Sequence, residues 1–195
     1  GCHDCCCGMG DSIVLDPYDI YQMNKHLGVK FEELLNHKIS LHVEEGLILP
    51  NLKMQGKEDG CAFLNEKGRC TIHAFRPGFC RLFPLGRIYE DGSFSYYLQS
   101  QECTKANRTK VKVNKWLGIP DLKQYENFVN EWHYFLKDTK ALLLRLSDAQ
   151  LNQELSMYLL NRFYTTAFDL ESDFYKQFDE RMTQMKKLIY TLDRQ

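Results

Sequence analysis

The sequence predicts an α+β fold in which a small cysteine-rich region of short strands, hairpins and helices precedes an α-helical C-terminal region. Two observations support this expectation. All eight cysteines lie at or before position 103 of the 195 residues, and apolar residues adopt a helical spacing from Pro120 onward. We therefore expect a cysteine-rich region over residues 1–118, followed by a helical region over residues 119–195 that packs on it.

Residues 12–15 form a short apolar run that predicts a strand, and the signals for the first helix follow it. Asp16 and Pro17 then predict a helix start, because aspartate caps free N–H groups and proline fits the first turn. Gly28 ends this helix, and residues 29–37 predict a second, shorter one.

Two segments are expected to form hairpins. Residues 39–54 predict two strands around Glu45-Gly46, and Pro50 favours an edge position for the second strand because it has no N–H to donate. Residues 85–97 predict another hairpin, since Asp91-Gly92 suits a two-residue turn.

The C-terminal region predicts three helices. Asp121 is expected to cap the first, Ser147-Asp148 starts the second, and residues 174–192 form the third. The apolar stripe of the first helix consists of Leu122, Tyr125, Phe128, Val129, Trp132, Phe135 and Leu136, continued by Leu142, Leu143 and Leu146. Core packing explains such a stripe without any cofactor, because an amphipathic helix buries one face.

Composition narrows the class of partner. Hydrophobic residues make up 44% of the chain and charged residues 26%, which is typical of a globular protein. The net charge of −1 gives no reason to expect nucleic acid or an anionic membrane as partner. No apolar run approaches the ~18 residues of a membrane span. We expect a cytoplasmic protein, and leave a redox or protein partner open.

The chemistry-bearing feature is the crowding of Cys2, Cys5, Cys6 and Cys7 within the first seven residues. A disulfide framework fits the even number of cysteines. However, a chain of this length can bury a core without disulfide crosslinks, and cysteines adjacent in sequence do not easily form disulfides with each other. A redox thiol fits the C-x-x-C spacing of Cys2 and Cys5, yet it leaves the other cysteines unexplained.

A metal explains more of the cysteines. Cys2 and Cys5 have a spacing that lets two thiolates grip one ion. Cys61, Cys70 and Cys80 each lie beside a predicted chain reversal, which can bring distant sulfurs together. Around Cys80, Arg76 and Arg81 could offset the negative charge of a thiolate-bound centre, although for either arginine alone a surface salt bridge is the simpler interpretation.

These motifs resemble a known family. C-x-x-C-C near the start, followed by C-x-F-L…G-R-C-x-I…R-P-x-x-C-R-x-F-P, resembles the zinc- or iron-chelating CxxCxxCC cysteine-cluster family, also described as Fe–S-cluster-containing proteins. Flagellin lysine N-methylase carries a related domain. The resemblance covers about residues 2–103, and its most specific part is residues 61–84.

The resemblance implies a ligand set and two cofactor-facing arginines. Arg76 and Arg81 match framing positions of the motif and are expected to bind the cofactor. The implied metal ligands are Cys2, Cys5, Cys6, Cys61, Cys70, Cys80 and Cys103. The sequence departs from the family in two ways: a further family cysteine would fall three residues before Cys2, outside this sequence, and Cys7 is extra.

The expected cofactor is Zn²⁺ or a [4Fe-4S] cluster, which thiolate ligation alone does not separate. We expect a metal-binding protein, with an Fe–S redox protein or a methyltransferase-like enzyme related to flagellin lysine N-methylase as alternatives. Residues 8–10 (Gly-Met-Gly) are not an S-adenosylmethionine loop, and the C-x-x-x-C-x-x-C spacing of radical enzymes is absent, so the sequence leaves enzymatic activity undecided. For His3 and His73, packing is the simpler interpretation than ligation.

Overall fold

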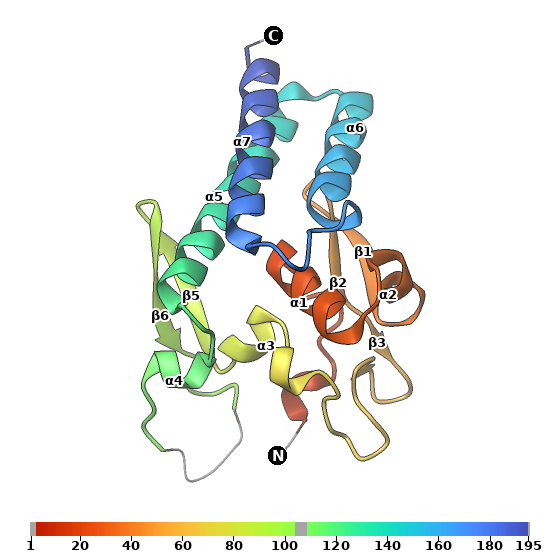
Figure 1. Ribbon diagram of the computed structural model, residues 1–195, viewed down its shortest axis with the longest axis vertical. Helices are drawn as coiled ribbons and strands as arrows, with labels where there is room; N and C mark the ends of the chain where they lie inside the picture. The colour runs from red at the N-terminus through yellow and green to blue at the C-terminus, as the bar shows by residue number, and fades with distance from the viewer. Residues whose placement is uncertain (1–2, 104–108, 195) are drawn as a thin grey trace.

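The computed structural model describes residues 3–103 and 109–194, and it has the mixed α+β fold that the sequence predicts (Figure 1). The strands form three two-stranded antiparallel hairpins: β1 (Ile39–Glu44) with β2 (Leu47–Leu52), β3 (Met54–Gln55) with β4 (Gly60–Cys61), and β5 (Leu85–Glu90) with β6 (Ser93–Leu98). The helices are α1 (Pro17–Leu27), α2 (Phe31–His37), α3 (Gly78–Leu82), α4 (Val113–Leu117), α5 (Leu122–Leu146), α6 (Ala149–Leu160) and α7 (Phe174–Leu192). Single turns of 3-10 helix form η1 (Asp4–Cys6) and η2 (His73–Phe75), and a π-helical turn forms η3 (Asn161–Thr165).

The first helix begins and ends at the predicted residues. Asp16 accepts a hydrogen bond from the Asp19 N–H, and the Asp19 carboxylate accepts one from the Asp16 N–H, which completes a capping box. Gly28 ends α1 with φ of 68°, a left-handed conformation that glycine adopts without steric cost.

The strand predicted at residues 12–15 is reduced to a single bridge between Val14 and Asn51. The Leu15 N–H donates to the Pro50 carbonyl, and the Leu52 N–H donates to the Ile13 carbonyl. Because Pro50 has no N–H to return to Leu15, the ladder along β2 stops there, in keeping with the edge role predicted for this proline.

The two longer hairpins close with the predicted turns. Glu45 and Gly46 have φ of 49° and 87°, and Asp91 and Gly92 have φ of 49° and 75°. Positive φ at both central residues is the signature of a two-residue turn whose twist matches that of the strands.

The C-terminal helices also begin where expected. The side chains of Asp121, Asp148 and Asp173 each accept a hydrogen bond from a backbone N–H in the first turn of α5, α6 and α7. In Figure 1, α5 and α7 lie side by side, and α6 lies next to the β1–β2 hairpin.

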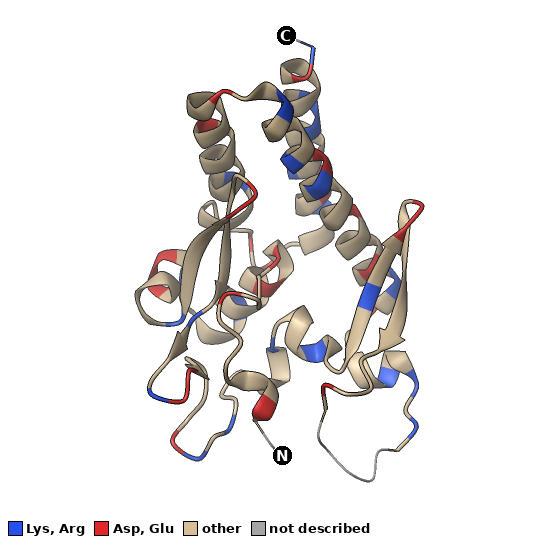
Figure 2. Ribbon diagram, turned by 180° about the vertical axis from the view of Figure 1, so that it is seen from behind, with Lys and Arg blue, Asp and Glu red and all other residues tan. Residues whose placement is uncertain are grey.

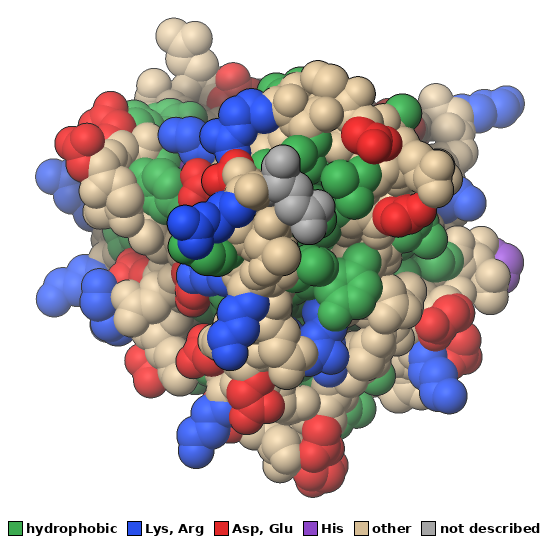
Figure 3. Space-filling model, turned by 90° about the horizontal axis from the view of Figure 1, so that it is seen from above, with side chains coloured by type: hydrophobic (Ala, Val, Ile, Leu, Met, Phe, Trp, Pro, Cys, Tyr) green, Lys and Arg blue, Asp and Glu red, His purple; other side chains and the backbone are tan. Residues whose placement is uncertain are grey.

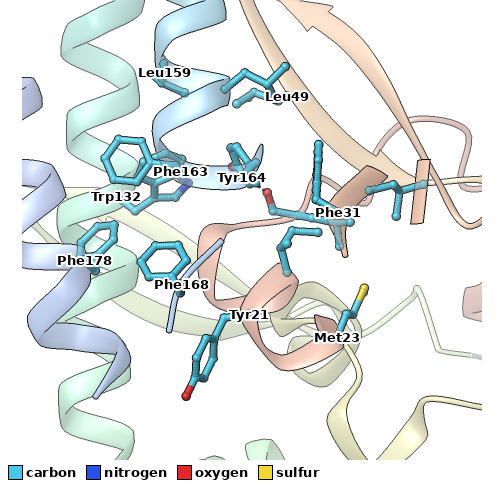
Figure 4. Close-up of a cluster of buried hydrophobic side chains, with 14 of the residues drawn as sticks. Tyr21, Met23, Phe31, Leu49, Trp132, Leu159, Phe163, Tyr164, Phe168 and Phe178 are labelled. Atoms are coloured by element: carbon cyan, nitrogen blue, oxygen red, sulfur yellow. Dashed lines mark hydrogen bonds between the residues drawn. The ribbon is translucent and has the colours of Figure 1, made fainter. Parts of the chain in front are cut away.

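The hydrophobic core joins residues on both sides of position 118. Aromatic and aliphatic side chains from α1, α2, β2 and the C-terminal helices meet in one buried cluster (Figure 4). Across it, the hydroxyl of Tyr164 donates to the carbonyl of Leu15 at 2.9 Å, although the two residues are 149 positions apart. Residues before and after position 118 therefore share one hydrophobic core.

Charges are mixed over the surface. In Figure 2, positions with lysine or arginine and positions with aspartate or glutamate are both spread along the ribbon. Figure 3 looks onto the end of the molecule where α7 ends and shows apolar side chains interspersed with charged ones. Within the described residues, the helices are too short or too polar to cross a bilayer.

Candidate metal centre

The N-terminal cysteines are held against the β3–β4 hairpin. Cys7 forms an antiparallel bridge with Gly60, and the N–H of Gly8 donates to the carbonyl of Asp59 at 2.9 Å. The His3 ring covers Gly68, where an added Cβ would lie 2.8 Å from the ring Nδ1. His3, the residue before η1, therefore packs against the loop that follows Cys61.

That loop returns the chain so that Cys70 lies near Cys61. The Asn65 side chain accepts hydrogen bonds from the N–H groups of Lys67 and Arg69, both at 3.0 Å, and fixes the turn. Leu64 and Cys70 then form an antiparallel bridge. The chain reversal predicted around Lys67-Gly68 is therefore present.

Cys80 lies in α3, and the side chains of Asp19 and Arg81 hold this short helix in place. The N–H of Gly78 donates to the buried carboxylate of Asp19 at 2.8 Å. Arg81 donates to the carbonyls of Ala74, Arg76 and Leu117, which ties the segment before α3 to α4. The Arg81 guanidinium therefore serves as a backbone clamp.

Five cysteines from three segments line one cavity of about 620 Å³: Cys5, Cys6, Cys61, Cys70 and Cys80. Electrostatic interactions link Cys6 with Cys61 and Cys80, and Cys70 with Cys5, so these thiols lie within electrostatic range of one another.

The other cysteines differ in position. Cys7 faces an adjacent hollow beside Gly60 and does not line this cavity. Cys103 is outside the lining as well, although its neighbour Glu102 contributes to it. Cys2 lies outside the described residues.

A hydrogen bond joins the thiols of Cys5 and Cys6. The hydrogen bond with the Cys6 thiol lowers the pKa of Cys5 to about 6, and the Arg76 guanidinium contributes to this shift. The same hydrogen bond raises the pKa of Cys6, which burial raises further. One thiolate is therefore stabilised at this end of the cavity near neutral pH.

The remaining three thiols resist ionisation in the metal-free chain. Burial raises the pKa of Cys61, Cys70 and Cys80, and for Cys80 the neighbouring Asp19 carboxylate adds to the effect. A bound cation reverses this preference, because a coordinated thiol gives up its proton. The donor set of clustered, half-buried thiols thus fits a thiophilic metal, whether Zn²⁺ or iron in an Fe–S cluster.

Arg76 and His73 complete this end of the cavity. Arg76 Nη1 lies 2.8 Å from His73 Nε2, and the positive charge of Arg76 lowers the pKa of His73. Arg76 also favours the thiolate forms of Cys5, Cys70 and Cys80. His73 Nε2 is occupied by this contact, but the residue is exposed, so the packed position expected for it is not what the structure shows.

The cysteines are gathered but not closed into a coordination shell. Over residues 3–103 and 109–194, no three side chains among His, Cys, Asp and Glu are arranged tightly enough to hold an ion as they stand.

Sequence reasoning missed two residues near the cavity. Asp19 is 59 positions from its partner Gly78, so no local pattern links them. Arg87 lies between Leu85 and Tyr89 on β5, and all three line the cavity. The sequence does contain one signal for Arg87, because the alternation of side chains along a strand places this charged residue on the same face as Leu85 and Tyr89.

The fold and the gathered thiols define a cysteine-cluster protein of mixed α+β architecture. Comparison with protein families matches residues 1–115 to CxxCxxCC, described as "Putative zinc- or iron-chelating domain". The match spans more than half of the chain, and the chain belongs to this family. No curated protein and no solved structure matches this chain.

Proposed function

We propose that this protein binds Zn²⁺ or an iron–sulfur cluster through the five cysteines of the cavity, namely Cys5, Cys6, Cys61, Cys70 and Cys80. Their arrival in one cavity from three separate segments is the observation that carries the proposal. Cys2 and Cys103 remain proposed further ligands from the segments that border the site.

The chain's own residues prepare this site for a cation. Asp19 and Arg81 hold the segment that carries Cys80, while Arg76 offsets negative charge on the thiolates. A bound centre would supply either a structural crosslink between the three segments or, as a cluster, a one-electron redox site.

Residues 119–195 act as a scaffold in this proposal, and the division near position 118 separates ligand-bearing from supporting chain. Tyr125 of α5 packs against Gly78 at the start of α3, which supports a positioning role for the helical region. A cytoplasmic location fits the proposal, because a reducing compartment keeps thiols available for metal.

Anaerobic purification followed by elemental analysis, acid-labile sulfide assay and visible absorption tests the proposal. Iron with sulfide and a brown colour support a cluster and the redox alternative, while a colourless protein with zinc supports a structural centre. Purified protein that contains neither metal, and that takes up neither zinc nor iron with sulfide under reducing conditions, overturns the proposal. Binding of S-adenosylmethionine is the separate test of the methyltransferase-like alternative.

A further inference from the structure

The cavity that holds the cysteines extends well beyond them. Zn–S bonds of about 2.3 Å describe a sphere of roughly 50 Å³, a small part of the cavity of about 620 Å³. The lining continues past Phe79 and Leu82 of α3 to the β5–β6 hairpin. In Figure 1, α3 lies between this hairpin and the N-terminal segment, so the cavity passes along α3 from one to the other.

One face of β5 forms the far wall. Leu85, Arg87 and Tyr89 alternate along the strand, so their side chains share a face, and all three line the cavity. Ile88 points to the opposite face and is 44% exposed. The far wall thus combines apolar surface with a single cationic side chain.

Arg87 has unused hydrogen-bonding capacity. Its Nε and Nη2 atoms are buried and make no hydrogen bond within the described residues. The guanidinium lies over the rings of Phe94, Tyr96 and Tyr125, at 5.3, 6.0 and 5.8 Å from their centroids. The hydroxyls of Tyr89, Tyr96 and Tyr125 also interact with the guanidinium, but Nε and Nη2 are left without a hydrogen bond of normal geometry. Buried donors without a well-aligned partner are costly.

The charge of Arg87 is only partly compensated. Asp16 and Asp19 interact electrostatically with Arg87; burial raises the pKa of both carboxyl groups, and for Asp16 the neighbouring Asp19 carboxylate adds to the effect. Asp19 already accepts hydrogen bonds from the N–H groups of Asp16 and Gly78. Arg81 is also close to Asp19, so the two arginines share this pair of buried carboxyl groups. In the cavity lining itself, Glu102 is a further carboxyl group.

From these observations we infer that the hairpin end of the cavity binds a small organic anion, a carboxylate or phosphate with an apolar or aromatic body. Arg87 anchors the charged group, and Leu85 with Phe79 contacts the body. The whole cavity, at about 620 Å³, lies within the range of about 300–1,000 Å³ that small-molecule sites occupy. The inference rests on the proposed function in that the ligand would be bound beside the metal centre.

Calorimetric titration of the full chain tests this inference, after its metal content has been measured. The probes are benzoate, phenyl phosphate, inorganic phosphate and benzyl alcohol, which has the aromatic body without the charge. We expect benzoate or phenyl phosphate to bind at least about tenfold more tightly than benzyl alcohol, equivalent to about 1.4 kcal/mol. Preference for phenyl phosphate identifies a phosphate ligand, and preference for benzoate a carboxylate.

Two pairs of variants locate the binding. Arg87→Gln should remove the tenfold preference for the anion, whereas Arg145→Gln, which changes an exposed residue paired with Asp193, should leave it unchanged. Leu85→Ala should weaken benzoate and benzyl alcohol together by about threefold, and Ile88→Ala on the other face of β5 should have no effect. If Arg87→Gln does not fold, the Leu85 and Ile88 pair decides the location.

The inference is overturned if no anionic probe binds at millimolar concentrations, or if benzyl alcohol binds as well as benzoate. It is also overturned if folded Arg87→Gln keeps the preference, or if Leu85→Ala binds the aromatic probes as the parent chain does. A chain that contains metal but binds no probe contradicts this inference alone. A chain that binds probes without holding metal contradicts the proposed metal centre instead.

Discussion

The Asp19 carboxylate accepts a hydrogen bond from the backbone N–H of Gly78 at 2.8 Å and so joins the first turn of α1 to the start of α3. Asp19 is only 4% exposed, and its other oxygen accepts the N–H of Asp16. This side chain therefore connects the hydrophobic core with the helix that carries Cys80.

Stability should fall as pH rises through the titration of Asp19. Burial raises its pKa to about 6 from an ordinary value of 3.8, so the folded chain holds this proton more tightly than the unfolded chain. The resulting stabilisation is complete below about pH 4 and is lost as pH rises through about 6, amounting to about 3 kcal/mol at most.

Urea unfolding of the parent chain and of Asp19→Asn, compared from pH 4 to about pH 8, measures this effect. The asparagine variant keeps an acceptor for Gly78 but has no proton to lose. The difference in unfolding free energy between the two proteins should therefore shift with pH in favour of the variant. A difference that is constant over this range contradicts the assignment.

Gly78→Ala should destabilise the protein by about 1–3 kcal/mol, the usual cost of overpacking. A Cβ at this position would overlap the hydroxyl of Tyr125, which is buried and cannot move aside. The ring Cζ of Tyr125 would lie 3.4 Å from the same Cβ, a tolerable contact.

Tyr125→Phe should therefore rescue Gly78→Ala. Since the Tyr125 hydroxyl makes no hydrogen bond of normal geometry and only a weak contact with Arg87, the phenylalanine variant alone should change stability by less than about 1 kcal/mol. A double-mutant cycle with urea unfolding gives the coupling energy between the two positions. Coupling near zero would show that the two side chains do not compete for space.

Much of the local structure could be predicted because its causes are local. Asp16-Pro17 and Gly28 bound α1, and Asp91-Gly92 closes the β5–β6 hairpin, since each acts on its own backbone. The strand expected at residues 12–15 was overestimated, because its extent depends on what a distant partner offers, and Pro50 offers no N–H.

The sequence predicts the type of ligand at the site, but it does not predict how the surrounding side chains are arranged. The cysteine spacing and the family motif indicate a thiolate site, and five cysteines do line one cavity. The roles of Asp19 and Arg87 arise from contacts between residues far apart in the chain, which no local pattern contains. Arg81 illustrates the difference, because the motif indicates its importance and the structure shows it bound to three backbone carbonyls.

Cys80→Ser should lower metal affinity by tenfold or more, since it removes a thiol from the cavity that no neighbour replaces. Cys7→Ser is the matched control, because Cys7 lies in the same crowded segment as Cys5 but faces the adjacent hollow. Metal content after equilibration with a competing chelator measures both variants. If Cys7→Ser empties the site while Cys80→Ser leaves it full, the proposed ligand set is wrong.

Arg81→Lys should destabilise the chain by about 2 kcal/mol, because one ammonium cannot span the carbonyls of Ala74, Arg76 and Leu117. Urea unfolding checks this, with Arg145→Lys as a surface control expected to change stability by less than about 1 kcal/mol. Because lysine keeps the positive charge, metal content should fall only as far as the segment around Cys80 loosens. If Arg81→Lys retains full stability yet loses metal, the guanidinium acts on the bound centre itself rather than through the backbone.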